Sequence, residues 1–189
     1  MLLETIRCEN GVPLHLPYHQ QRLEESLYAL GSDASYDLKS LIFPPEEGLY
    51  RCRFLYDSAA CRIEFHPYSP RTFTSLKIVS ANTLDYRYKY ADRSALDALY
   101  AQRGDCDDVL IVQHGTLKDT TIANIALWIE GKWLTPEVPL LKGTTRARLI
   151  HEKRIVPHPL TLDDLVRAEK IALMNAMVGF IEVEHGIIV

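Results

Sequence analysis

The sequence lacks the features that mark several large classes of proteins. Only four of its 189 residues are cysteine, and no two of these stand at metal-ligand spacing, so a metal site is not expected. No apolar run approaches the roughly 20 residues that a membrane-spanning helix needs. A net charge of −4 gives no basic surface for nucleic acid. We therefore expect a globular protein with no metal, no membrane contact and no nucleic-acid partner.

The first residues also lack the pattern of a secretory signal peptide. Glu4 stands where such a peptide needs positive charge followed by a long apolar stretch. Cys52 and Cys61 fall in one predicted hairpin, but its register does not place the two thiols opposite each other. Reduced thiols are typical of a reducing compartment. These observations predict a cytoplasmic protein.

Alternating and helical stretches predict a sheet with a helix in the first part of the chain, an α+β pattern. The turn Asn10-Gly11 is a strong signal for a hairpin over residues 2–16. A helix is expected from Pro17 to Gly31, because proline favours helix starts and glycine favours helix ends. Its apolar stripe consists of Leu23, Leu27 and Leu30. The other expected elements are a hairpin over residues 49–66 and a strand over residues 76–79.

Residues 81–88 have no period and contain several polar residues, so we place a connection between two domains there. The expected domains are residues 1–84, a small α+β domain, and residues 85–189, an α/β domain. In the second domain, apolar runs predict strands, and capped stretches predict helices. The expected strands cover residues 109–112, 122–129, 171–174 and 180–183, and the expected helices cover 93–101, 144–154 and 161–169.

Lys89 stands just before the predicted helix at residue 93, between two tyrosines. A lysine that forms an imine must be partly desolvated, because desolvation lowers its pKa and keeps the amine nucleophilic. Neighbouring aromatic rings can provide such surroundings. A solvated lysine in a polar linker is the other interpretation of this residue.

Other segments contain polar residues that can bind a ligand or have an ordinary structural role. Gly143-Thr144-Thr145-Arg146 precedes a predicted helix, where backbone N–H groups and hydroxyls can hold a phosphate. An ordinary helix cap is the alternative for this segment. Taken alone, Asp119 is a turn aspartate and Arg22 an exposed helix arginine. Asn175-Ala176 would then belong to a loop between two buried strands.

Taken together, these segments resemble the class IV aminotransferase family, whose members use pyridoxal 5'-phosphate (PLP) as an electron sink. Residues 89–93 are similar to the Lys-x-x-Asn-Arg segment of aminodeoxychorismate lyases. Residues 119–125 are similar to the family's Glu-Gly-Thr-Ile-Ala-Asn-Ile, with Asp119 in place of glutamate. The remaining matches are Leu-x-Gly-x-x-Arg over residues 141–146, His-x-x-Arg-Leu over 19–23, Phe-Glu-Thr-Ile-Arg over 3–7 and Ala-Glu-Lys-Ile…Asn-Ala-x-x-Gly over 168–179.

The resemblance implies a two-domain α+β fold of PLP fold type IV, similar to D-amino-acid aminotransferase, and usually a homodimer. The family normally has an extra strand and a Gly-Asp-Gly turn before its Phe-Glu-Thr-Ile-Arg strand, so we expect a chain truncated at its N-terminus. The resemblance also implies roles for single residues. These are Lys89 as the catalytic lysine that carries the cofactor, Arg22, Thr144 and Thr145 at the phosphate, Asp119 at the pyridine nitrogen, and Asn175 and Ala176 on the phosphate or substrate side.

Three functions from different classes are compatible with these residues. The first is a PLP-dependent lyase that releases pyruvate from 4-amino-4-deoxychorismate and gives 4-aminobenzoate for folate synthesis. The second is a class IV aminotransferase for branched-chain or D-amino acids. The third is a weakly catalytic or non-catalytic relative kept for binding. We favour the lyase, and we expect a small-molecule amine as the substrate.

Overall fold

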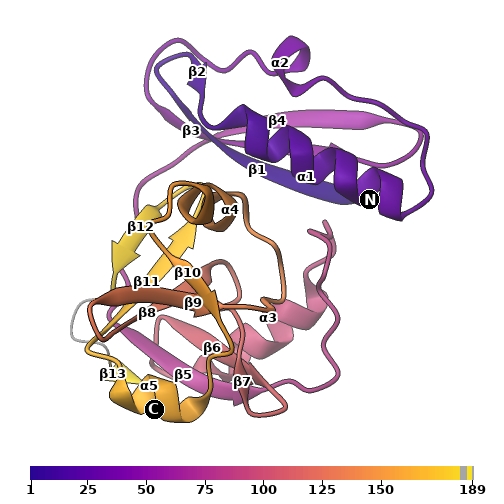
Figure 1. Cartoon of the computed structure of the whole chain (residues 1–189). Coiled ribbons are helices and arrows are strands. Elements are labelled where there is room, and N and C mark those ends of the chain that lie inside the picture. The colour runs from indigo at the N-terminus through magenta and orange to yellow at the C-terminus, as the bar shows by residue number, and fades with distance from the viewer. Residues whose placement is uncertain (184–186, 189) are drawn as a thin grey trace. The chain divides into compact units, whose positions relative to one another are not determined.

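The computed structural model describes residues 1–183, 187 and 188 (Figure 1). By their internal contacts, these residues form two compact units. The N-terminal unit contains Met1–Pro70 together with Tyr88–Asp92, and the C-terminal unit contains Arg71–Arg87 together with Arg93–Val189. A compact unit is defined by contacts and is not the same as a separate domain. The domain boundary that we expect between residues 84 and 85 therefore stays a prediction.

The N-terminal unit is a four-stranded antiparallel sheet with one long helix, as the alternating pattern predicted. The strand order is β2-β1-β3-β4. Its core includes Ile6, Leu23 and Phe54, which come from β1, α1 and β3. The elements are β1 (Leu2–Glu9), β2 (Val12–Pro13), α1 (Leu16–Ala29), α2 (Leu38–Leu41), β3 (Leu49–Tyr56) and β4 (Cys61–Pro67).

The predicted hairpin turns of this unit are confirmed, and one helix residue is corrected. Asn10 and Gly11 both have positive φ, which the tight turn between β1 and β2 requires. Cys52 pairs with Phe65 across β3 and β4, so it does not face Cys61. The predicted apolar stripe of α1 is wrong at Leu30, which is 53% exposed. Leu30 is the C-cap residue and lies at the end of the helix, where residues 28–31 are all exposed.

The segment Tyr88–Asp92 returns to the N-terminal unit and runs beside the start of β1. Leu3 donates its backbone N–H to the carbonyl of Lys89 at 2.9 Å. Tyr90 forms an isolated antiparallel bridge with Leu2. The rings of Tyr88 and Tyr90 pack edge to face, with 6.1 Å between their centroids. Both rings also pack against the unit's hydrophobic core. The backbone of Lys89 is therefore fixed to β1.

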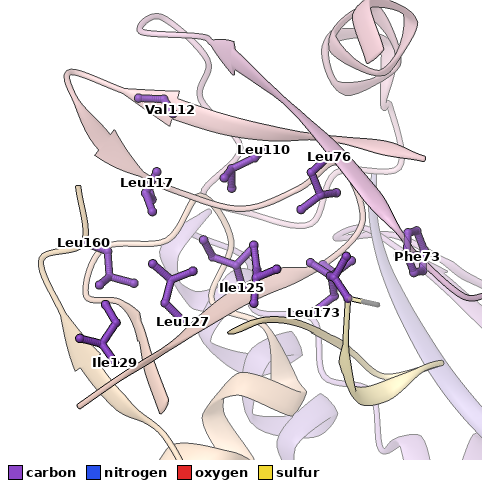
Figure 2. Packing of buried hydrophobic residues seen from close by; sticks show 13 residues of the cluster. Phe73, Leu76, Leu110, Val112, Leu117, Ile125, Leu127, Ile129, Leu160 and Leu173 are labelled. Atoms are coloured by element: carbon purple, nitrogen blue, oxygen red, sulfur yellow. The ribbon is translucent and has the colours of Figure 1, made fainter. Parts of the chain in front are cut away.

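The C-terminal unit contains two sheets that share one hydrophobic core (Figure 2). A five-stranded sheet has the order β10-β9-β8-β11-β12, and a four-stranded sheet has the order β13-β5-β6-β7. Leu76 and Leu110 from the second sheet meet Ile125 and Leu173 from the first in this core. The strands are β5 (Ser75–Ser80), β6 (Asp108–Gln113), β7 (Thr116–Leu117), β8 (Asn124–Ile129), β9 (Lys132–Pro136), β10 (Val156–His158), β11 (Lys170–Asn175), β12 (Gly179–Glu182) and β13 (Ile187–Ile188).

The helices of this unit lie close to their predicted positions. The strand expected from residue 122 begins at Asn124, because Thr120 N–H donates to the carbonyl of Ala123 and closes a turn before the strand. The helix expected to reach residue 154 ends at His151. The helices are α3 (Ser94–Tyr100), the 3₁₀ turn Ala101–Arg103, α4 (Thr144–His151) and α5 (Leu162–Arg167).

Candidate functional site

Asp119 is a buried carboxyl group at the turn between β7 and β8. Only 4% of the residue is exposed. Its Oδ2 accepts from the backbone N–H of Leu141 at 2.9 Å, and its Oδ1 accepts from Nδ2 of Asn124 at 2.8 Å. Burial raises the pKa of Asp119 to about 6, although both hydrogen bonds and the charge of Arg146 act in the opposite direction. The group therefore titrates close to neutral pH.

The predicted phosphate turn forms the start of α4. Gly143 is the N-cap residue and has no side chain with which to cap the N–H groups of the first turn. Thr144 and Thr145 follow it and are 6% and 5% exposed. The N-terminal end of a helix carries partial positive charge and favours anions. Two buried hydroxyls therefore lie beside a helix end that suits a phosphate.

Arg146 fixes this helix start to the end of β9. It is 8% exposed, and its Nη2 donates to the carbonyl of Pro136 at 2.7 Å. Its Nε donates to the hydroxyl of Thr135 at 3.3 Å. Arg146 is therefore committed to holding α4 in place. Its positive charge also favours the ionised form of Asp119.

Asn124 joins the acid to the segment that leads into the turn. Besides its bond to Asp119, its Nδ2 donates to the carbonyl of Leu141 at 2.8 Å. A Cβ atom on Gly143 would lie 1.9 Å from Oδ1 of Asn124, so the amide touches the glycine backbone. Asp119, Thr144 and Thr145, which the sequence placed at two ends of a cofactor, thus belong to one connected region.

Asn175 and Ala176 lie at the end of β11 and in the turn that follows it. Oδ1 of Asn175 accepts from the N–H groups of Met177 and Val178 at 2.8 and 2.9 Å. Its Nδ2 donates to the carbonyl of Ile122 at 3.2 Å. Because Ile122 is in the turn after Asp119, the Asn175 loop borders the same region of the C-terminal unit.

In the N-terminal unit, Arg22 holds a fully buried carboxylate. Its Nε donates to Oε1 of Glu4 at 2.8 Å, and its Nη2 donates to Oε2 at 2.5 Å. Nδ1 of His19 lies 2.6 Å from the same Oε2. Burial alone would raise the pKa of Glu4, but Arg22 and His19 together lower it to about 2. The guanidinium of Arg22 is thus oriented by a bidentate ion pair.

His19 and Lys89 lie in the same part of the N-terminal unit. Burial lowers the pKa of His19, Glu4 counteracts this, and the positive charges of Arg22 and Lys89 lower it further. Lys89 is half-buried and has Tyr88 and Tyr90 on either side. The aromatic surroundings expected for the Lys89 amine stay a prediction, because the rings of Tyr88 and Tyr90 pack on each other and on the hydrophobic core of the unit.

Sequence reasoning missed Asn124 as a partner of Asp119 in the C-terminal unit, and Glu4 and His19 as partners of Arg22 in the N-terminal unit. Each lies inside a motif that was recognised, but a motif does not say which way a side chain points. Asn124 follows Asp119 by five residues, and the turn between them brings the two side chains together. The contact between Asn124 and Gly143 could not be predicted from the spacing of the motifs, because the two residues belong to different segments.

Comparisons with known proteins agree on one family and one fold. A family model described as amino-transferase class IV matches residues 54–185. A Haemophilus influenzae protein of uncharacterised function is 35% identical over 184 residues, which are 94% of this chain and 98% of that protein. A crystal structure from Haemophilus somnus 129pt, provisionally named a 4-amino-4-deoxychorismate lyase, is 35% identical with a TM-score of 0.88, over 94% of this chain and 96% of the other.

A second crystal structure is similar in fold alone. It comes from Mesorhizobium loti and is provisionally named an amino-acid aminotransferase. Its sequence is 23% identical, its TM-score is 0.79, and the match covers 100% of this chain and 99% of the other. Among the residues that the structure describes, no helix is long and apolar enough to cross a membrane.

Proposed function

Because the chain belongs to the class IV aminotransferase family and has the α+β fold of PLP fold type IV, we propose that it is a PLP-dependent lyase acting on 4-amino-4-deoxychorismate. The observation that carries this proposal is the hydrogen-bonded link between buried Asp119 and the segment that enters the Gly143–Thr145 turn. An acid for a ring nitrogen and a helix end for a phosphate are thereby held together. We also propose a cytoplasmic homodimer, as the family resemblance implies.

The residues present fit PLP by their chemistry. Thr144 and Thr145 would bind the phosphate at the start of α4. Arg22, whose Nε and Nη2 form the bidentate pair with Glu4, would contribute positive charge to the phosphate. Lys89 would carry the cofactor through its side-chain amine. Asp119 would face the pyridine nitrogen, and Asn175 and Ala176 would border the phosphate or the substrate.

When bound, PLP supplies an electron sink that no protein side chain provides. With a pKa of about 6, Asp119 is mostly ionised at pH 7 and can keep the ring nitrogen protonated. Lys89 Nζ would then move the proton from the substrate carbon that bears the amino group. Arg22 and the Gly143–Thr145 turn would hold the phosphate end still during this transfer.

Two observations favour the lyase over an aminotransferase. Residues 168–179 resemble the Ala-Glu-Lys-Ile…Asn-Ala-x-x-Gly segment of aminodeoxychorismate lyases, whereas many transaminating relatives have a threonine- or serine-rich loop at this point. The Haemophilus somnus structure, which has the lyase name provisionally, is similar over almost its whole length. The two reactions can be distinguished by experiment, because a lyase needs no second amino acceptor.

The test is product analysis of the purified protein with PLP and 4-amino-4-deoxychorismate. We expect pyruvate and 4-aminobenzoate in equal amounts without any added keto acid. We expect Lys89→Arg to abolish both products, and Lys132→Arg, which changes an exposed lysine, to leave them unchanged. Amino-group exchange that depends on an added keto acid would instead identify an aminotransferase. A protein with no activity and no PLP absorbance band near the visible edge would be a non-catalytic relative.

A further inference from the structure

The side-chain amide of Asn124, the first residue of β8, makes two hydrogen bonds that its place in the strand does not require. The residue is 5% exposed, and its two N–H donors reach two acceptors from different segments. One acceptor is the carboxylate of Asp119, and the other is the backbone carbonyl of Leu141. Because an amide NH₂ group has two hydrogens, these contacts use its full donor capacity.

The contact between Asp119 and Leu141 closes this arrangement. The N–H of Leu141 donates to the second carboxylate oxygen of Asp119, while its carbonyl accepts from Asn124. Asp119, Asn124 and Leu141 therefore form a closed ring of three hydrogen bonds. A closed ring of buried hydrogen bonds fixes relative positions better than any single bond, because no member can move without leaving a buried polar group unpaired.

The carbonyl side of the same amide limits the phosphate turn. Oδ1 of Asn124 occupies the space that a side chain at Gly143 would need, as the 1.9 Å distance to an added Cβ shows. Gly143 has φ −70°, which any residue can adopt, so its backbone conformation does not require glycine. The need for glycine at this position comes from Asn124.

We infer that Asn124 is a positioning residue that sets the spacing between the Asp119 carboxylate and the Gly143–Thr145 turn. This inference rests on the proposed function, in which these two groups bind opposite ends of PLP. Asn124 itself touches no reacting atom in this scheme. It acts through Asp119 on one side and through Leu141 and Gly143 on the other.

The first test is the titration of Asp119 in the protein without PLP. An N–H donor to a carboxylate favours the ionised form, so its removal should raise the pKa of Asp119. Carboxyl ¹³C NMR should show a higher midpoint for Asn124→Ala than for wild type. Asn82→Ala, which removes an exposed asparagine in the same unit, should leave the midpoint unchanged. An unchanged midpoint in Asn124→Ala would refute the inference.

The second test measures PLP affinity. Without Asn124, PLP must itself order the Asp119 carboxylate and the Gly143–Thr145 turn when it binds, so Asn124→Ala should raise the Kd for PLP by about tenfold. Asn82→Ala should bind PLP as tightly as wild type. Equal affinity of Asn124→Ala and wild type would contradict a role in cofactor binding. If wild type itself binds no PLP, the proposed function fails, whereas the Asp119 titration still decides whether Asn124 sets the carboxylate.

The third test uses the contact with Gly143. Gly143→Ala alone should destabilise the C-terminal unit, because its Cβ would overlap Oδ1 of Asn124. The double variant Asn124→Ala/Gly143→Ala removes the overlap and should be about as stable as Asn124→Ala. Strictly additive effects would show that the two residues do not restrict each other. If Asn124→Ala does not fold, the Asp119 titration and the PLP affinity are measured on Asn124→Ser. The single hydroxyl donor of serine can serve only one of the two acceptors.

Discussion

Asp119 is a carboxyl group whose ionisation is disfavoured in the folded protein. Its pKa of about 6 lies above the ordinary value of 3.8, because burial outweighs the hydrogen bonds from Leu141 and Asn124. Between pH 3.8 and 6 the folded state binds more protons at this site than the unfolded state. The site therefore lowers the stability of the fold as pH rises through this window. This loss of stability fits the proposed role of Asp119 as the charged partner of the pyridine nitrogen.

Replacement by asparagine should remove this pH dependence. From pH 4 to pH 7, Asp119→Asn should gain about 2 kcal/mol of unfolding free energy relative to wild type, whatever its effect at pH 4. Both tryptophans, Trp128 and Trp133, lie in the C-terminal unit, so their fluorescence in urea reports on this unit. Asp105→Asn, which changes an exposed aspartate, is the control. Parallel pH profiles of Asp119→Asn and wild type would show that Asp119 titrates normally.

Arg22 has a structural partner that affects how its proposed role must be tested. Glu4 is fully buried and keeps its charge through Arg22 and His19. Arg22→Ala should therefore destabilise the N-terminal unit by about 3–5 kcal/mol, because it leaves a buried carboxylate with too few partners. Glu4→Gln/Arg22→Met removes both charges and should lose much less. Hydrogen exchange of the β1 amides measures the stability of this unit.

The double variant separates folding from cofactor binding. It lacks the guanidinium but keeps a neutral, filled core, so it should fold and yet bind PLP more weakly than wild type. Arg62→Ala, in which an exposed arginine with 68% of its side chain accessible is removed, is the control for both measurements. If Arg22→Ala is no less stable than Arg62→Ala, the Glu4 ion pair contributes little to the fold.

For single residues, sequence motifs identified candidate site residues but not the side chains that these residues contact. Lys89, Asp119 and the Gly143–Thr145 turn could be selected from the sequence because each stands in a recognisable segment. Glu4 and Arg22 are eighteen residues apart and meet only because α1 packs on β1. Spacing within a sequence contains no information on such a contact until the fold is known. Whether the seven selected residues bind PLP stays a prediction.

Among the elements, α5 has the clearest local determinant. The carboxylate of Asp164 accepts from the backbone N–H and the hydroxyl of Thr161 at 2.8 and 2.9 Å. The Thr161 side chain in turn accepts from the backbone N–H of Asp164, so the two residues form a complete capping box at the helix start. Asp164→Ala should therefore cost about 1 kcal/mol of stability, measured by tryptophan fluorescence in urea.

The neighbouring aspartate provides a matched control. Asp163 is in the same first turn but is exposed, whereas Asp164 is 6% exposed. Asp163→Ala should change the unfolding free energy by only a few tenths of a kcal/mol. Equal losses for the two variants would mean that general helix electrostatics, rather than the contact with Thr161, stabilise α5.

Elements with a strong local pattern were predictable, and short edge elements were not. Asn10-Gly11, the alternation over residues 49–66 and the apolar run at residues 109–112 led to the correct strands. The strand β10 has all three residues exposed and contains a proline, so it shows no burial pattern. It exists because it pairs in parallel with β9, which is a tertiary contact. The two-residue strand β13 forms in the same way beside β5.

For the whole molecule, the sequence gives the fold class through its family resemblance, and the family model and the similar structures confirm it. The division into compact units depends on something that no local pattern contains. Tyr88–Asp92 joins the N-terminal unit because it forms backbone contacts with the start of β1, while residues 71–87 belong to the other unit. Substrate identity is equally absent from local patterns, because it depends on side chains gathered from many segments.

The central claim is that Lys89 carries PLP, and peptide mapping after borohydride reduction tests it most directly. The protein is incubated with PLP, reduced, digested and analysed by mass spectrometry. We predict a pyridoxyl group on Lys89 in wild type and in Lys132→Arg, and its loss in Lys89→Arg. A pyridoxyl group on a different lysine, or none with PLP in excess, would contradict the account.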